Sequence, residues 1–121
     1  ADPRGRDGDN EPVDVAVGLV SGAPEKVIPV VSALRGNYPN PFNPSTTIAF
    51  DLARETDMRL SIYGIDGRLV RELVRGHYPA GRHEEVWDGR DAHGRGVASG
   101  TYFYVMQTED LRQTRRMLLV K

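Results

Sequence analysis

Cysteine is absent from the 121 residues of this chain, so disulfides, thiol catalysis and cysteine-ligated metal sites are excluded. Net charge is also small, at −1 by formal count, and gives no reason to expect nucleic acid or an anionic membrane as a partner. No apolar run is long enough to span a bilayer and no signal peptide is recognisable, so we expect no membrane insertion. Because the first residue is Ala1 and not methionine, we expect either a mature product or an excised piece.

Proline and glycine are plentiful, at 8 and 13 residues, beside 39% hydrophobic residues. This composition is typical of one small domain with many turns and a modest core. Three of the prolines lie in residues 37–45, NYPNPFNPS, a segment that we call the brace. Proline lacks a backbone donor and holds φ at about −65°, so the brace can form neither a helix nor an inner strand. Its two large apolar side chains, Tyr38 and Phe42, are predicted to anchor it on a neighbouring core.

The residues before the brace divide into two parts. Residues 1–11, ADPRGRDGDNE, are polar and glycine-rich, and we interpret them as a flexible tail. Residues 12–36 form an extended arm, which begins with four apolar residues that alternate with Asp, Ala and Gly: Val13, Val15, Val17 and Leu19. This two-residue period predicts a half-buried strand, and therefore a candidate donor strand that adds to a sheet.

Residues 46–121 contain short alternating segments separated by turn signals such as Asp66-Gly67. The predicted strands are 47–52, 58–63, 69–74, 82–87, 97–98, 101–107 and 113–120. About seven short strands with no helix-length segment predict an all-β fold, an immunoglobulin-like β-sandwich that carries the extended N-terminal arm. Trp87, the only tryptophan, is expected to be a core pillar, and Tyr102 is expected to bond back to the corner before its strand.

Several segments also resemble a known family. GNYPNPFNPSTTI (36–48) and DGRLV (66–70) resemble the C-terminal domains of the type IX secretion family. AGRH (80–83), WDGRD (87–91) and VASGTYFY (97–104) continue the resemblance and are similar to the immunoglobulin-like domain of the flagellar hook-capping protein. The resemblance implies a non-catalytic domain on an exported bacterial protein, which acts as a sorting signal at the end of larger cargo. Only 28 residues precede Pro29, so we expect either a fragment or a domain that is itself the product.

Side chains that could support chemistry are scattered along the chain. His77, His83 and His93 lack the His-x-His or His-x-x-x-His spacing of a metal site, which favours surface positions. Asp88 and Asp91 are expected to bond their own turn amides. No acid or base accompanies a nucleophile in a recognisable motif. We therefore expect no enzymatic activity, no catalytic residue, no cofactor and no metal.

Two functions fit this pattern. The first is a secreted, extracellular structural subunit that assembles with copies of itself into a filament, with Val13, Val15, Val17 and Leu19 inserted into a neighbour. The second is a sorting and surface-attachment signal that acts with the outer-membrane secretion machinery. A third, a carbohydrate- or surface-binding module, would need an aromatic platform that the sequence does not suggest.

Overall fold

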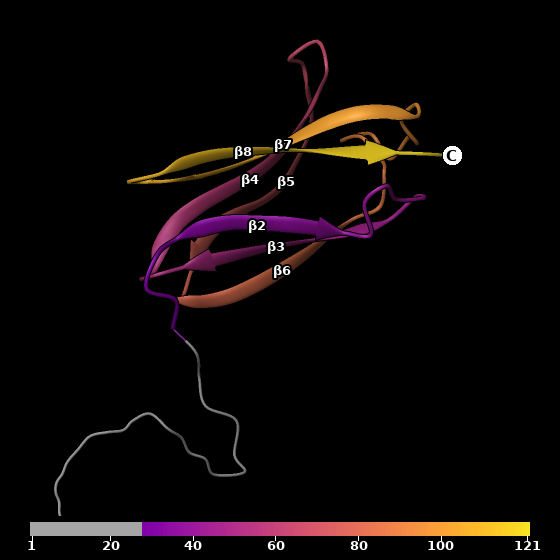
Figure 1. Ribbon diagram of the computed structural model, residues 1–121. Helices are drawn as coiled ribbons and strands as arrows, with labels where there is room; N and C mark the ends of the chain where they lie inside the picture. Colours follow the sequence, from indigo (N-terminus) through magenta and orange to yellow (C-terminus); the bar gives the residue numbers. More distant parts are fainter. Residues whose placement is uncertain (1–27) are drawn as a thin grey trace, which may run out of the picture.

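The computed structural model describes residues 28–121 and contains seven β-strands (Figure 1). The strands are β2 (Ala33–Tyr38), β3 (Thr46–Leu52), β4 (Thr56–Gly64), β5 (Leu69–Tyr78), β6 (Gly81–Trp87), β7 (Gly100–Thr108) and β8 (Arg112–Leu119). No helix occurs in residues 28–121. The all-β sandwich predicted from the sequence is therefore confirmed.

Two antiparallel sheets face each other across one core (Figure 1). The small sheet has the order β2-β3-β6, and the large sheet has the order β5-β4-β7-β8. β3 and β6 pair without interruption from Thr46 opposite Trp87 to Leu52 opposite Gly81. By contrast, the register between β4 and β5 shifts twice. The small sheet is therefore regular along its β6 edge, whereas the β5 edge of the large sheet is irregular.

The core consists of alternate side chains from both sheets. Ile48, Phe50 and Leu52 of β3 face Leu60 and its neighbours on β4, and all are fully buried. The other residues of this cluster are Leu34, Phe42, Met58, Ile62, Trp87, Tyr102, Tyr104, Met106, Met117 and Leu119. The strict alternation of β3 and β4 explains why the sequence pattern located these strands.

One strand differs from the sequence prediction. Residues 97–98 form no strand, and the nearest pairing is an isolated bridge between Arg90 and Gly96. The seventh strand is instead β2. It crosses the predicted boundary between the arm (12–36) and the brace (37–45). β2 has a register shift between Leu34 and Asn37, so only Leu34 is buried. This bulge removes the alternation by which a strand is recognised. The sandwich therefore begins at Ala33 and not at Thr46.

The chain enters the sandwich at one end and leaves it at the other (Figure 1). At the entry, the Ser32 hydroxyl accepts a hydrogen bond from Ala53 N–H at 2.9 Å, just beyond the pair Leu52–Gly81. The entry point thus lies beside the start of β6. The brace and the C-terminus lie together at the opposite end (Figure 1).

Candidate functional site

The brace is held against β8 by backbone hydrogen bonds. Phe42 N–H donates to Leu118 O at 2.9 Å, and Val120 N–H donates to Phe42 O at 2.9 Å. These two bonds form a parallel bridge between Phe42 and Leu119. The loop after β6 packs on the brace from the other side, because a Cβ on Gly89 would lie 2.8 Å from Pro44 O. The brace is therefore part of the sandwich and closes its end.

Two asparagines orient the brace, and sequence reasoning did not single them out. Asn40 Oδ1 accepts from Leu118 N–H at 3.0 Å. Asn37 Oδ1 accepts from the Tyr104 hydroxyl at 3.2 Å, while its Nδ2 donates to Thr46 Oγ1 at 3.1 Å. Burial raises the pKa of Tyr104, which keeps its hydroxyl protonated as a donor. Through these bonds Asn37 satisfies a hydroxyl of β7 and Asn40 satisfies a backbone amide of β8.

Three of the four predicted anchors form an aromatic row inside the sandwich. The Phe42 and Trp87 ring centroids lie 5.6 Å apart, and those of Trp87 and Tyr102 lie 5.5 Å apart. Trp87 Nε1 donates to Arg90 O at 2.9 Å, and the Tyr102 hydroxyl donates to Ala98 O at 2.6 Å. Both polar groups are thus satisfied where their rings are buried.

The prediction that Tyr38 anchors the brace on the core is wrong. Its side chain is 83% exposed, because residues that pair across strands share one face and Tyr38 pairs with Thr47, which pairs with Val86. This row lies on the outer face of the small sheet, opposite the core. Val86 is 59% exposed, and a shallow hollow on this part of the sheet is lined by Gly36, Asn37, Tyr38, Thr47, Ala49 and Glu84. The outer face therefore offers an exposed aromatic ring beside small side chains.

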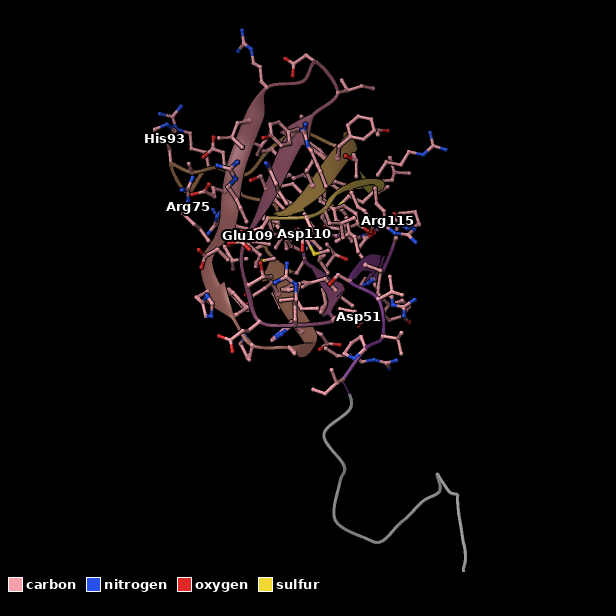
Figure 2. All side chains as sticks on the ribbon, turned by 90° about the vertical axis from the view of Figure 1, so that its left-hand side faces the viewer. Asp51, Arg75, His93, Glu109, Asp110 and Arg115 are labelled. Atoms are coloured by element: carbon pink, nitrogen blue, oxygen red, sulfur yellow. The ribbon has the colours of Figure 1, made fainter. Side chains whose placement is uncertain are left out.

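A buried carboxylate, Asp51, pairs with Ala33 at the start of β2, whereas Tyr38 ends this strand. Figure 2 labels Asp51. Arg35 Nε donates to Asp51 Oδ2 at 2.7 Å, and Arg82 Nε lies 3.7 Å from Asp51 Oδ1. The two guanidinium groups come from the strands on either side of β3, so Asp51 links all three strands. The carboxylate was missed because it occupies an ordinary outward position in the alternating pattern of β3.

The histidines and turn carboxylates serve local contacts. His77 lies on β5 between Glu55 and Asp57, at 2.8 and 2.9 Å, and hydrogen bonds to first Glu55 and then Asp57 raise its pKa. Asp91 Oδ1 accepts from two backbone amides of its own turn, and these bonds lower its pKa. Asp88 likewise accepts from Arg90 N–H, so both turn predictions are confirmed. Within residues 28–121, no group of three or more His, Asp or Glu side chains is arranged to hold a metal ion.

The lateral sides of the sandwich differ. On the β2–β8 side, Leu34 N–H donates to Gln113 Oε1 at 2.7 Å and Arg115 Nε donates to Leu34 O at 3.0 Å. On the β5–β6 side, the Tyr78 hydroxyl donates to Glu85 Oε2 at 3.4 Å, and the Tyr78 and His83 rings form a T-shaped pair. We call these the closed side and the open side.

The predicted donor residues Val13, Val15, Val17 and Leu19 lie outside the described residues 28–121. Within that described part, no helix has the length and apolarity that a bilayer crossing requires.

Comparison with known families decides where the chain belongs. The profile of the FlgD Ig-like domain family matches residues 38–111. The chain belongs to this family. The match extends from the end of β2 to the turn before β8 and includes residues 38–45 of the brace. No curated protein matches the chain.

Three solved structures share the fold. PorU from Porphyromonas gingivalis, in its dimeric latent form, is 21% identical with a TM-score of 0.59, over 84% of this chain and 10% of PorU. PorZ from the same organism is 23% identical with a TM-score of 0.50, over 73% of this chain and 11% of PorZ. FlgD from P. aeruginosa is 24% identical with a TM-score of 0.50, over 61% of this chain and 57% of FlgD. The chain thus spans about a tenth of PorU and PorZ and just over half of FlgD.

Proposed function

We propose that this FlgD-type domain is a non-catalytic sorting and surface-attachment module of an exported protein, which acts with secretion machinery of the type IX kind. The observation that carries the proposal is the same fold in PorU and in PorZ, which is described as an essential bacterial surface component of the type IX secretion system. In both cases the matched part is about a tenth of a much longer chain. A small domain attached to a large protein is the arrangement that a sorting module requires.

The placement of exposed side chains supports this function. The brace and the aromatic row close the end of the sandwich, so the fold does not depend on Tyr38 or Val86. An exposed aromatic ring beside small residues is typical of a surface that binds another protein. We therefore assign the contact with the machinery to the outer face of the small sheet.

The test is export of a reporter fused to residues 29–121, in a host with a type IX system and in the same host without it. We expect the reporter at the cell surface only in the first host. The double variant Tyr38→Ser, Val86→Ser should keep the fold and lose most of the export.

The matched control is Ile65→Ser, Leu69→Ser, which removes two apolar side chains of similar exposure at and beside the β4–β5 turn. Export should persist in this control. A folded fusion that remains inside the host with an intact system would contradict the proposed function.

Self-assembly is the second candidate, favoured by the β6 edge, which pairs with no other strand on its outer side within residues 28–121. In this case Val13, Val15, Val17 and Leu19 of one copy would add to a sheet of the next copy, and the contact would propagate as a filament. Negative-stain microscopy of the chain, with and without residues 1–25, tests it. Filaments that disappear with the arm, or with Val15→Asp, Val17→Asp, would support assembly, whereas monodisperse particles in all samples would contradict it.

A further inference from the structure

We infer that residues 13–19 pair as an additional strand with the β6 edge of their own chain and fill a strand position that the sandwich leaves open. This inference is independent of the secretion proposal. It rests on the asymmetry of the sheets, on the regularity of β6 and on the place where the chain enters the sandwich.

The asymmetry is visible in the burial of two edge strands of the same large sheet. On β8, opposite β2 and the brace, the core-facing Met117 and Leu119 are buried, at 2% and 0% exposure. On β5, at the other edge, Leu73, Val74 and Tyr78 pack against the core but stay only partly buried. Within residues 28–121 the small sheet has three strands and the large sheet has four, so this part of the chain places no fourth strand above these β5 side chains. An apolar strand beside β6 would cover them.

β6 is the edge best suited to accept this strand. The β2 and β8 edges are joined by the Leu34–Gln113 and Leu34–Arg115 bonds. The β5 edge has two register shifts, and Val70 O already accepts from Ala92 N–H at 3.2 Å. β6 is paired through seven residues without a shift. A regular edge of this kind presents unpaired backbone groups that another strand can use.

The position of the chain entry brings the arm to this edge. Ser32 bonds to Ala53, next to the pair Leu52–Gly81, so the entry is about two strand spacings, or about 10 Å, from the start of β6. The residues 20–27 between arm and entry can extend to about 26 Å, which is sufficient. Residues 13–19 lead toward this end of the sandwich, whereas β6 starts from it. A strand formed by residues 13–19 would therefore run antiparallel to β6. The alternating segment 13–19 also has the same number of residues as β6.

The alternation then fixes which side chains face inward. With Leu19 next to Gly81, the four apolar residues share a face with His83, Glu85 and Trp87, which point toward the core side. Asp14, Ala16 and Gly18 share the outer face with Arg82, Glu84 and Val86. The apolar side chains of the arm are thereby directed over the partly buried strip of β5.

Pairing within the chain outcompetes pairing between chains at ordinary concentrations. A short flexible connection gives an effective concentration of about millimolar, far above micromolar protein. Assembly between copies would be the swapped form of the same contact.

Engineered disulfides provide the first test, because the chain has no cysteine of its own. Ala16→Cys with Glu84→Cys should close within one molecule in a glutathione buffer at micromolar protein, detected by intact mass and a non-reducing gel. Pairs of Ala16→Cys with Arg82→Cys or Val86→Cys detect a slip by two residues. The control pair, Ala16→Cys with the exposed Arg75→Cys on β5, should close at least about tenfold less. Equal closure in both pairs, no closure in any pair, or a ladder of linked copies would overturn the inference.

Amide hydrogen exchange provides the second test without new covalent bonds. In the full chain, every second β6 amide should exchange about tenfold more slowly than in a chain without residues 1–27. Val15→Asp, Val17→Asp should abolish this protection, whereas Ala16→Asp, Gly18→Asp places the same charges on the outer face and should retain most of it. Identical β6 exchange in the full and shortened chains would overturn the inference.

Discussion

The closed and open sides of the sandwich differ in how their edge strands are covered. On the closed side, side chains of β8 hydrogen-bond the backbone of β2, and the brace adds backbone bonds to Leu118 and Val120. On the open side, Tyr78 makes one long hydrogen bond to Glu85 and ring contacts with His83 and Phe50. Edge strands expose backbone groups that must be paired, covered or protected by charge. The comparison shows that only one side of this sandwich is completed by residues 28–121.

The largest effect is expected from removing the side chain that holds the brace on the closed side. Phe42→Ala should reduce the free energy of unfolding by about 3–5 kcal/mol, because it leaves a cavity beside Trp87. Tyr38→Ala, in the same brace but exposed, should change it by no more than about 0.5 kcal/mol. Urea denaturation of both variants measures the difference. Similar losses would mean that the brace is not anchored by burial.

A smaller loss is expected at the contact between the brace and the loop after β6. Gly89 has a φ of 75° and its added Cβ would meet Pro44 O at 2.8 Å. Gly94 has a φ of 80° with open space around it. Both changes to alanine should cost about 1 kcal/mol for the left-handed conformation, and Gly89→Ala should cost roughly 1–3 kcal/mol more, since backbone must move.

Thermal unfolding of the two alanine variants separates the cost of the left-handed conformation from the cost of the contact with Pro44. Equal losses at both positions would show that the loop does not press on the brace.

Two single hydrogen bonds, one on each side, test whether the closed side contributes more to stability than the open side. Gln113→Ala leaves Leu34 N–H without its 2.7 Å acceptor on the closed side and should cost about 1 kcal/mol. Tyr78→Phe removes the 3.4 Å bond to Glu85 on the open side and should cost no more than a few tenths of a kcal/mol, because the bond is long. Urea denaturation measures both losses. A larger loss of unfolding free energy in Tyr78→Phe than in Gln113→Ala would contradict the stronger bonding of the closed side.

The alternating residues of β3 and β4, together with the turn signals between the other strands, predicted the sandwich. β3 and β4 place every second residue in the core, whereas Trp87 is the one β6 residue in the core cluster. The Asp66-Gly67 turn has Gly67 at a φ of 84°. β2 escaped prediction because its bulge leaves only Leu34 buried. The same bulged strand ends in Tyr38, and its neighbours on the outer face decide the exposure of that ring. The residues next to Tyr38 in the sequence could not predict this exposure, since Thr47 and Val86 come from other strands.

Long-range polar contacts escaped prediction for a similar reason. Asn37 with Tyr104, Asn40 with Leu118, and Asp51 with Arg82 are separated by 31 to 78 positions. No local pattern marks such a pair. The Asp88 and Asp91 turns were predictable because their partners lie within four residues.

The smallest effect concerns pH at the β4–β5 pair, where His77 of β5 donates to Glu55 and Asp57. These hydrogen bonds raise the pKa of His77 in the folded protein above its ordinary value of 6.5. A raised pKa means that the folded state binds the proton more tightly, so the stabilisation is fully present below pH 6.5 and is lost as pH rises through the folded pKa. His77→Gln should therefore flatten the fall in urea midpoint between pH 6 and 8, and Glu55→Gln, Asp57→Asn should flatten it similarly. Because the ring is exposed, added salt should weaken the wild-type slope. A slope that survives both variants would assign the pH dependence to groups other than His77.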